Sequence, residues 1–313
     1  MNVGFIGLGN LGEKLANSLL RNGINLSVID LDKKIMEKFK LNGALICKNG
    51  KELAEKNDII ITCLPSPEIS SKVMESYNGV ISGISQNKIW LEMSTTDSSE
   101  VIRIGKIIQS KKALALDGPV SGGCHRAETG NISIFVGGKR EGFDKIFPIL
   151  SILGKDILYT GPLGSASILK VITNFLATTH LVALGEALMV AKKSNINLDT
   201  AFKGIKSSSG NSFVHETESQ LILNGSYKID FTMDLVLKDI SLFYKLSNHY
   251  GIPVEICPIL IRIFKEGSKK FGQRAWSSMI VKRLEDYCKT DLRVDGYPNE
   301  LKDKEPETKG MEL

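Results

Sequence analysis

The sequence predicts an α/β domain with a doubly wound, mostly parallel sheet, followed by an all-α C-terminal domain that a long helix joins to it. In the first half, short apolar runs such as residues 2–6 and 58–63 alternate with amphipathic stretches. This pattern is typical of parallel strands covered by helices on both faces. After residue 164, apolar residues recur at spacings of three and four, as they do along helices.

The length of 313 residues fits two domains. We expect the sheet domain to span residues 1–162 and the helical domain to span residues 163–290. From residue 291 the chain becomes polar, with two prolines and mixed charges, so we expect a C-terminal tail over residues 291–313 that is partly ordered against a neighbouring surface.

Composition excludes several classes of protein. The chain is 42% hydrophobic, and its net charge of +5 is spread along the sequence without a basic, aromatic-rich stripe, so nucleic-acid binding is not expected. The five cysteines are widely spaced and form no CxxC, and the four histidines are scattered. These patterns argue against a disulfide framework or a metal site and favour a reducing compartment.

We expect a cytoplasmic protein with no membrane segment. The apolar stretch 171–190 is interrupted by Asn174, His180 and Glu186. The first predicted strand already includes Val3, which leaves no room for a removable leader.

The first strand, residues 2–6, leads into a glycine loop that we define as residues 7–12. An amphipathic helix follows. The loop has the spacing GxGxxG and consists of Gly7, Leu8, Gly9, Asn10, Leu11 and Gly12. In the Rossmann-type arrangement the first glycine permits a tight turn, the second lets a pyrophosphate approach the backbone, and the third lets helix and strand pack closely. The helix N-terminus favours the phosphates. We therefore expect a dinucleotide cofactor.

The second strand, residues 25–29, ends in Asp30, roughly 20 residues after the glycines. An acid at this position accepts hydrogen bonds from the adenosine ribose hydroxyls, and its charge repels a 2′-phosphate. Asp30 therefore predicts NAD as the cofactor, with NADP less favoured. The alternative is that Asp30 is an ordinary turn residue.

Two further strands, residues 58–63 and 88–93, place candidate cofactor contacts at their carboxyl ends. In a parallel sheet, ligands bind at that edge. The first strand is followed by Leu64 and Pro65, and the second by Ser94 and Thr95. For residues 94–97 the alternative is that they cap the helix that follows.

Residues 113–138 form the most informative stretch. A strand over residues 113–117 ends in Gly-Pro, and a serine and two glycines, Ser121, Gly122 and Gly123, precede a second strand at residues 132–136. Because glycine has no Cβ, a ligand can reach the backbone N–H groups, and the Ser121 hydroxyl adds a donor. This group of donors suits a carboxylate. The alternative is a plain turn between two strands.

A long helix is predicted from residue 165 to residue 194. Lys170 and Asn174 lie four residues apart and so share one face of it. An amine and an amide one turn apart form a candidate acid/base group with a helper. The alternative is an exposed lysine beside a neutral asparagine. Further helices are predicted at residues 199–206, 232–249, 254–271 and 275–288, with a loop at 205–215.

Several motifs occur together and in order, so that the chain resembles the β-hydroxyacid dehydrogenase family over about residues 2–285. They are GFIGLGNLG (4–12), CLP (63–65), STT (94–96), DGPVSGG followed by Ala127 and Gly130 (117–130), GPLGSASILKVITN (161–174) and LVLKD (235–239). The resemblance implies an NAD(P)-dependent dehydrogenase or reductase acting on CH–OH groups. Its substrate would be a small 3-hydroxy acid, similar to 3-hydroxyisobutyrate or more acidic, or the corresponding semialdehyde.

The resemblance also implies roles for individual residues. Lys170 matches the family's catalytic lysine, and Asn174 matches the asparagine that supports it. The loop at residues 121–123 would hold the substrate carboxylate. Lys238 matches a residue near both nicotinamide and substrate, with Phe231 before it on the cofactor side, and Asp239 would position Lys238.

The chain departs from the family pattern at two places. Residues 124–126 (Cys-His-Arg) are bulkier and more cationic than the small residues often found there, and Ala275 stands where an acid is usual, followed by Trp276. We hypothesise that Arg126 or Arg274 binds an extra anionic group of the substrate. The alternative is that both are surface arginines.

Three other functions are less favoured. An imine-reducing relative would usually lack a lysine at the position of Lys170, and a non-catalytic dinucleotide-binding protein would not need Lys170, Asn174 and Ser121 together. A phosphogluconate-type decarboxylating dehydrogenase has a much longer helical half. Because the long helix and apolar runs such as residues 259–264 exceed what a small helical domain hides, we also expect a homodimer or homotetramer.

Overall fold

The computed structural model describes all 313 residues and confirms the predicted fold class. The chain forms two compact units. The sheet unit consists of Met1–Lys170 together with Asp303–Leu313, and the helical unit consists of Val171–Lys302. The division at residue 170 falls inside the long helix, eight residues after the expected boundary at 162, and the C-terminal segment expected as one tail is divided between the two units.

The sheet unit contains one sheet in the order β10-β9-β8-β6-β5-β4-β1-β2-β3, with β7 paired to β8. All neighbouring strands are parallel except that β8 runs antiparallel to β6 and β7. The strands are β1 (Asn2–Ile6), β2 (Asn25–Ile29), β3 (Leu45–Ile46), β4 (Ile59–Thr62), β5 (Ile89–Glu92), β6 (Leu114–Asp117), β7 (Val120–Ser121), β8 (Ile132–Gly138), β9 (Gly154–Gly161) and β10 (Met311–Glu312).

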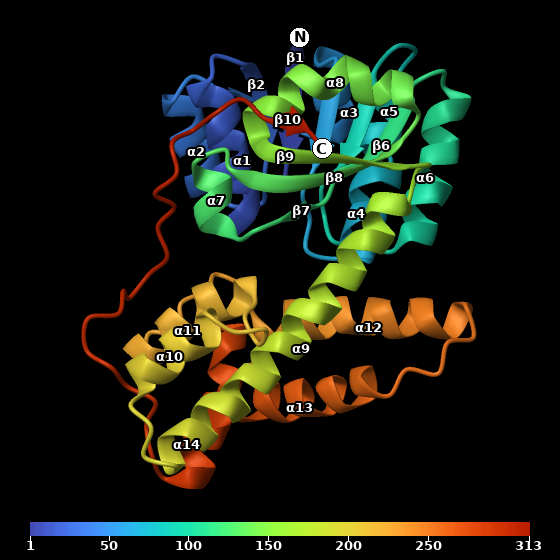
Figure 1. Cartoon of the computed structure of the whole chain (residues 1–313). Helices are drawn as coiled ribbons and strands as arrows, with labels where there is room; N and C mark the ends of the chain where they lie inside the picture. The colour runs from blue at the N-terminus through green and yellow to red at the C-terminus, as the bar shows by residue number, and fades with distance from the viewer. The chain divides into compact units, whose positions relative to one another are not determined.

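Helices cover both faces of this sheet (Figure 1). They are α1 (Asn10–Arg21), α2 (Lys33–Leu41), α3 (Gly50–Lys56), α4 (Pro67–Glu75), α5 (Val80–Gly83), α6 (Ser98–Ser110), α7 (Cys124–Glu128) and α8 (Arg140–Leu153). Ile59 and Ile61 of β4 belong to one core cluster, whereas Ile60 belongs to the other. Because alternate residues of a strand face opposite sides, the continuous apolar runs in the sequence fill two cores.

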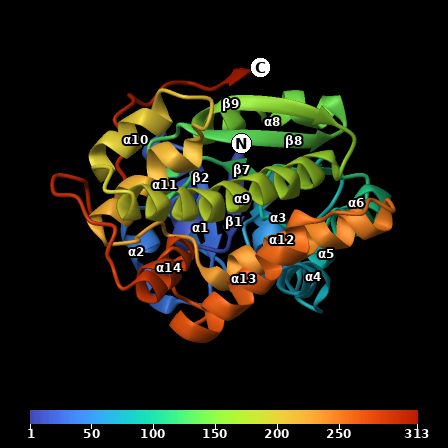
Figure 2. The same ribbon diagram turned by 60° about the horizontal axis from the view of Figure 1, so that its bottom comes forward.

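The helical unit contains α-helices and one 3₁₀ turn but no strand. Its elements are α9 (Ser165–Lys193), whose first turns belong to the sheet unit, α10 (Leu198–Lys206), α11 (Phe213–Asn224), α12 (Met233–His249), α13 (Ile256–Phe271), η1 (Ser277–Ile280) and α14 (Lys282–Cys288). Helices α12 and α13 run side by side (Figures 1 and 2). Phe175 of α9 stacks on Phe243 of α12 with ring centroids 4.0 Å apart.

Two predictions about this unit are wrong in detail. The single helix expected at 275–288 is a 3₁₀ turn followed by α14. The loop expected at 205–215 is shorter, because α10 continues to Lys206 and α11 begins at Phe213. No helix was predicted between residues 206 and 232, so α11 was missed; its start is capped by the Ser212 hydroxyl, which accepts a hydrogen bond from His215 N–H at 3.0 Å.

Helix α9 is long and apolar enough to cross a membrane by length and composition alone, although only a third of its most apolar window is buried. Within the helical unit, Leu181, Leu184 and Leu188 of this helix are buried in the core. Burial in the core therefore accounts for one face of this helix.

Candidate active site

The glycine loop between β1 and α1 contains glycines of two kinds. A Cβ on Gly7, whose φ is +99°, would lie 2.2 Å from the carbonyl oxygen of Cys63, and one on Gly12 would lie 2.0 Å from that of Gly7. Both glycines are therefore required by the protein's own backbone. A Cβ on Gly9 would meet no atom within 4 Å. Packing does not explain Gly9, but the approach of a bound pyrophosphate would.

The start of α1 is also suited to a bound pyrophosphate. Gly9 is the N-cap of α1 and makes no side-chain capping bond, so the helix N-terminus offers its positive end to a phosphate. Leu8 has a buried side chain, while Asn10 is exposed and Leu11 is partly buried.

Asp30 connects the end of β2 to this loop. One carboxylate oxygen accepts the N–H of Leu8 at 2.5 Å, and the other accepts the N–H of Asp32 at 2.8 Å. A carboxylate has about four acceptor positions, so two ribose hydroxyls can still be accommodated. The side chain is therefore more than an ordinary turn residue, because it holds the glycine loop in place.

The loops after β4 and β5 are tied together by Ser94. Leu64 N–H donates to Ser94 Oγ at 2.7 Å, and both the N–H and the hydroxyl of Ser94 bond to Glu92. Glu92 is almost fully buried, and this burial raises its pKa. Pro65 is exposed and Thr95 is partly buried beside this network. Capping, the alternative considered for residues 94–97, is carried out by Asp97, whose carboxylate accepts Ser99 N–H at 2.8 Å.

The loop at Ser121, Gly122 and Gly123 joins β7 to α7. Gly122 has a φ of +127° and Gly123 a φ of +89°, conformations that side chains rarely adopt. Ser121 and Gly122 are partly buried and Gly123 is exposed. Two such residues in succession form a turn that a residue with a Cβ would strain, which leaves the backbone free of side chains at both positions.

Asp117, at the end of β6, organises the start of α9. Its carboxylate accepts Gly164 N–H at 2.9 Å, Ser167 N–H at 2.7 Å and the Ser167 hydroxyl at 2.9 Å. Burial raises the pKa of Asp117 in spite of these bonds. The sequence interpretation did not assign this residue a role, although an acid directly after a buried strand was a usable signal.

Lys170 follows Ser167 within one turn of α9 and belongs to the same unit as the glycine loop and the loop at 121–123. Only 8% of Lys170 is exposed. The alternative of a surface lysine is therefore wrong. Because a buried lysine is rare unless it is paired or functional, its burial strengthens the case for a chemical role.

The remaining predicted residues lie in the helical unit, where Asn174 and Lys238 both contact Asp239. Asn174 Nδ2 donates to Asp239 Oδ2 at 2.5 Å, and Lys238 Nζ lies 2.7 Å from Asp239 Oδ1. Asp239 is 1% exposed. Phe231 is partly buried, and its carbonyl accepts Ser277 N–H at 2.8 Å. The link between Asn174 and Asp239 spans 65 residues, and no feature of the sequence indicated it.

Both arginines considered for an extra anionic group have carboxylate partners within their own units. Arg126 Nη2 lies 3.3 Å from Glu305 Oε1, and Arg274 Nη1 lies 3.2 Å from Asp234 Oδ2. The Arg274 side chain is 72% exposed, as expected for a surface arginine, whereas that of Arg126 is 28% exposed. Trp276 forms an isolated antiparallel bridge with Thr232.

Comparison with protein families finds a match for each part of the chain. The NAD binding domain of 6-phosphogluconate dehydrogenase matches residues 2–161. The family described as NAD-binding of NADP-dependent 3-hydroxyisobutyrate dehydrogenase matches residues 164–284. Both matches are to nicotinamide-dependent dehydrogenases.

Individual proteins are similar over almost the whole chain. 2-(Hydroxymethyl)glutarate dehydrogenase of Eubacterium barkeri is 33% identical over 297 residues, which cover 95% of this chain and 98% of the relative. Mitochondrial 3-hydroxyisobutyrate dehydrogenase of Rattus norvegicus is 28% identical over 285 residues, covering 88% and 85%. The crystal structure of 3-hydroxyisobutyrate dehydrogenase from Salmonella typhimurium has the same fold, with a TM-score of 0.82, 24% identity, and coverage of 90% of this chain and 99% of that one.

Proposed function

Because the chain belongs to the β-hydroxyacid dehydrogenase family and is an NAD(P)-dependent dehydrogenase acting on CH–OH groups, we propose that it interconverts a small 3-hydroxy acid and its semialdehyde. The observation that carries the proposal is the burial of Lys170 one turn after the helix start that Asp117 holds. A buried amine on a fixed helix turn is suited to proton transfer at a reacting oxygen.

The residues of the sheet unit fit a dinucleotide. The glycine loop, with open space at Gly9, would hold the pyrophosphate, and Asp30 would accept the ribose hydroxyls. Leu64, Pro65 and Thr95 would contact the rest of the cofactor at the carboxyl ends of β4 and β5. When bound, the nicotinamide supplies or takes up the hydride.

We propose NAD as the preferred cofactor. The two backbone N–H groups that hold Asp30 keep its carboxylate at the end of β2, where its charge would repel a 2′-phosphate. NADP remains the alternative, because one matching family is described as NADP-dependent.

In the reducing direction, Lys170 as an ammonium would give a proton to the carbonyl oxygen as the carbonyl carbon receives hydride. Its charge would also stabilise the developing alkoxide. In the oxidising direction, the neutral amine would take the hydroxyl proton as hydride leaves the carbinol carbon. Asn174, one turn further along α9, would support Lys170, and its bond to Asp239 fixes the orientation of its amide.

The substrate carboxylate would be held by the Ser121 hydroxyl and the backbone N–H groups of Gly122 and Gly123. Lys238 would add a positive charge near the nicotinamide and the substrate, with its ammonium held by Asp239. Phe231 would contact the cofactor. These roles rest on the motifs shared with the family. The positive φ angles of Gly122 and Gly123 support the role in carboxylate binding, because they keep side chains away from the backbone there.

A substrate panel tests this proposal. We would measure the oxidation of NADH and of NADPH with small semialdehydes, and the reduction of NAD and NADP with 3-hydroxyisobutyrate and 2-(hydroxymethyl)glutarate. We expect turnover with at least one carboxylate-bearing pair, and a higher kcat/KM with the NAD couple. The matching aldehydes without a carboxylate are the controls and should be poor substrates. Turnover that does not require the carboxylate would contradict the proposal.

We also propose a homodimer or homotetramer. Helices α9 and α13 leave Leu176, Val190, Ile256 and Ile259 exposed. Large apolar side chains left exposed on helices are candidates for burial at an interface between chains. Light scattering coupled to gel filtration should give two or four times the mass of one chain, and a monomer at micromolar concentration would contradict this proposal.

A further inference from the structure

The C-terminal tail, which we define as residues 303–313, is docked on the sheet unit. It ends in β10, where Met311 and Glu312 pair in parallel with Asp156 and Ile157 of β9 (Figures 1 and 2). Just before this strand, Gly310 N–H donates to Ser151 O at 2.8 Å. A Cβ at this glycine would lie 2.0 Å from the carbonyl oxygen of Gly154. The tail is therefore fitted closely to the unit that it covers.

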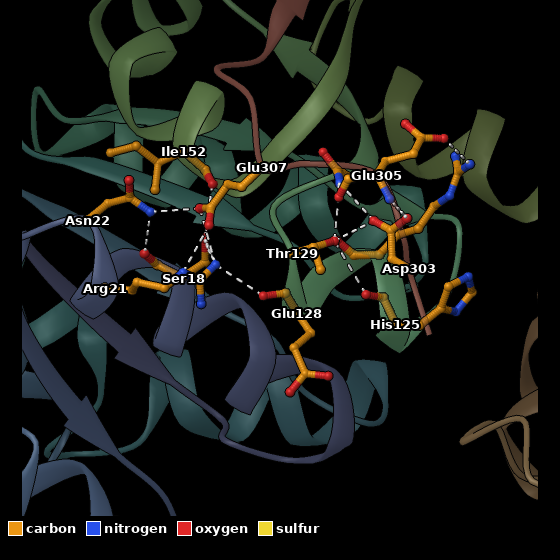
Figure 3. A network of polar contacts seen from close by, with 12 residues as sticks. Ser18, Arg21, Asn22, His125, Glu128, Thr129, Ile152, Asp303, Glu305 and Glu307 are labelled. Carbon is orange, nitrogen blue, oxygen red and sulfur yellow. Dashed lines mark hydrogen bonds and ion pairs between the residues drawn. The ribbon is translucent and has the colours of Figure 1, made fainter. Parts of the chain in front are cut away.

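The tail also contacts the segment that follows the loop at 121–123. Asp303 Oδ2 accepts a hydrogen bond from the Thr129 hydroxyl (Figure 3). It accepts another from Asn131 Nδ2 at 2.7 Å. Asn131 Nδ2 also donates to the Glu305 carbonyl at 3.1 Å. Asn131 has no exposed surface, and two of the three acceptors of its amide N–H groups belong to the tail; the third is the Thr129 hydroxyl at 3.3 Å.

Glu305 and Glu307 extend the same contact. The Glu305 carboxylate lies 3.3 Å from Arg126 Nη2 of α7 and 2.6 Å from Lys155 Nζ. Asp303, Glu305 and Glu307 are alternate residues, and the carboxylate of each bonds to a residue of the sheet unit.

Glu307 meets residues on both sides of this segment. Its carboxylate accepts from Arg21 Nε at 3.0 Å and from Asn22 Nδ2 at 2.9 Å, as Figure 3 shows. Arg21 in turn donates to the carbonyl of Glu128, the last residue of α7, at 3.0 Å. A Cβ on Gly130 would lie 3.3 Å from Glu307 Oε1. The tail thus fits against the backbone between α7 and β8 as well as against its side chains.

Helix α7 and the residues beside it need tertiary contacts to keep their conformation. Helix α7 has five residues, far fewer than an isolated helix needs to be stable. Glycines with positive φ flank it, Gly122 and Gly123 before it and Gly130 (+72°) after it. The ion pair of Lys14 with Glu128 at 2.9 Å fixes it from α1. Burial of Ala127 in the core and the bond from Arg21 to the Glu128 carbonyl hold it as well, and the tail adds the contacts described above.

The contacts of the tail differ in burial and therefore in how much they stabilise its position. Glu312 pairs with Arg140 at 2.6 Å, but both side chains are substantially exposed, and an exposed ion pair stabilises little. Asp303 bonds instead to a buried amide and a hydroxyl in the segment that follows α7. The functional consequence is therefore expected at Asp303 and Glu305, and Glu312 provides a matched control.

We propose that the tail is a positioning element of the substrate loop. Asp303 and Glu305 hold residues 126–131, and this fixes the turn at Gly122 and Gly123 that precedes α7. The part of the inference that concerns substrate rests on the proposed function, which gives this turn the substrate carboxylate. The tail acts through the loop and does not itself touch the reacting atoms.

The test compares the double variant Asp303→Ala/Glu305→Ala with the control Glu312→Ala. Hydrogen exchange followed by mass spectrometry would report on the amides of residues 121–131. We expect roughly tenfold faster exchange in the double variant and no change in the control. Deletion of residues 303–313 should produce the same change, and the double variant keeps the test valid if the shortened chain does not fold. Unchanged exchange at 121–131 would overturn the proposal.

Kinetics separate positioning from a purely structural role. The double variant should raise KM for the carboxylate substrate about tenfold, while kcat at saturation and NADH affinity stay near wild type. Faster exchange with an unchanged KM would overturn the positioning role. If no substrate in the panel is turned over, the proposed function fails, but the exchange experiment still decides whether the tail holds the loop.

Discussion

Two buried aspartates, one in each unit, organise the residues that match the family's motifs, but they do so in different ways. Asp117 in the sheet unit bonds to two backbone N–H groups and one hydroxyl at the start of α9. Asp239 in the helical unit bonds to the side chains of Asn174 and Lys238. A carboxylate that bonds to backbone determines where a helix begins, whereas one that bonds to side chains determines how functional groups are oriented. We therefore expect loss of Asp117 to damage the fold and loss of Asp239 to damage activity.

The largest effect is expected at Lys170, the residue that Asp117 positions through α9. Lys170→Ala should lower kcat by roughly a thousandfold, because it removes the proton donor and acceptor, while NADH still binds. Steady-state kinetics and NADH fluorescence titration measure the two quantities. Lys192→Ala, near the other end of α9, is the matched control. A Lys170→Ala enzyme within tenfold of wild type would remove the lysine from this role.

The next largest effect is expected for Asp239→Asn. The change keeps the shape of the side chain but removes the charge that holds Lys238 and weakens the acceptor for Asn174. We expect kcat to fall by roughly tenfold to a hundredfold, since small misplacement of a catalytic group costs this much. The free energy of unfolding, from urea titration, should change by less than about 1 kcal/mol. If Asp239→Asn strongly lowered the free energy of unfolding but left kcat normal, Asp239 would be a residue of the fold and not one that orients functional groups.

Asp117→Ala should show the opposite pattern. Two backbone N–H groups at the start of α9 would lose a buried acceptor, and we expect a loss of about 3 kcal/mol in the free energy of unfolding. Part of the activity should survive in the folded fraction at low temperature. Urea titration and kcat corrected for that fraction provide the comparison with Asp239→Asn. Equal stability losses in the two variants would show that the distinction between them is wrong.

The smallest effect concerns the cofactor. Asp30→Ser removes one negative charge near the position of a 2′-phosphate, so the preference for NADH over NADPH in kcat/KM should fall by roughly fivefold. Ser retains a hydroxyl that can accept the N–H of Leu8, which limits damage to the glycine loop. A wild-type enzyme that already prefers NADPH would make this account of Asp30 untenable.

Much of the sheet unit could be predicted from sequence because its strands are continuous apolar runs. The predicted bounds of β1 and β2 match the structure. Strand β9 was missed because it is mostly half-buried and has no continuous apolar run. Strand β10 was missed because it lies in a polar tail and needs β9 as a partner.

The candidate site was predictable only where a motif is local. The glycine loop, Asp30 and the spacing of Lys170 and Asn174 can be recognised from neighbouring residues. The bond between Asn174 and Asp239, and those from Thr129 and Asn131 to Asp303, depend on tertiary packing and join residues more than sixty positions apart. The burial of Lys170 could not be predicted either, because helical spacing does not indicate which face of a helix packs against the rest of the protein.

The most direct test of the central claim is a crystal structure of the enzyme with NAD and a 3-hydroxy acid. We predict that Lys170 Nζ lies within about 3 Å of the substrate hydroxyl, with the carboxylate on Ser121 and the backbone of Gly122 and Gly123. A complex in which the Lys170 amine points to solvent, away from the nicotinamide and the substrate, would contradict the account.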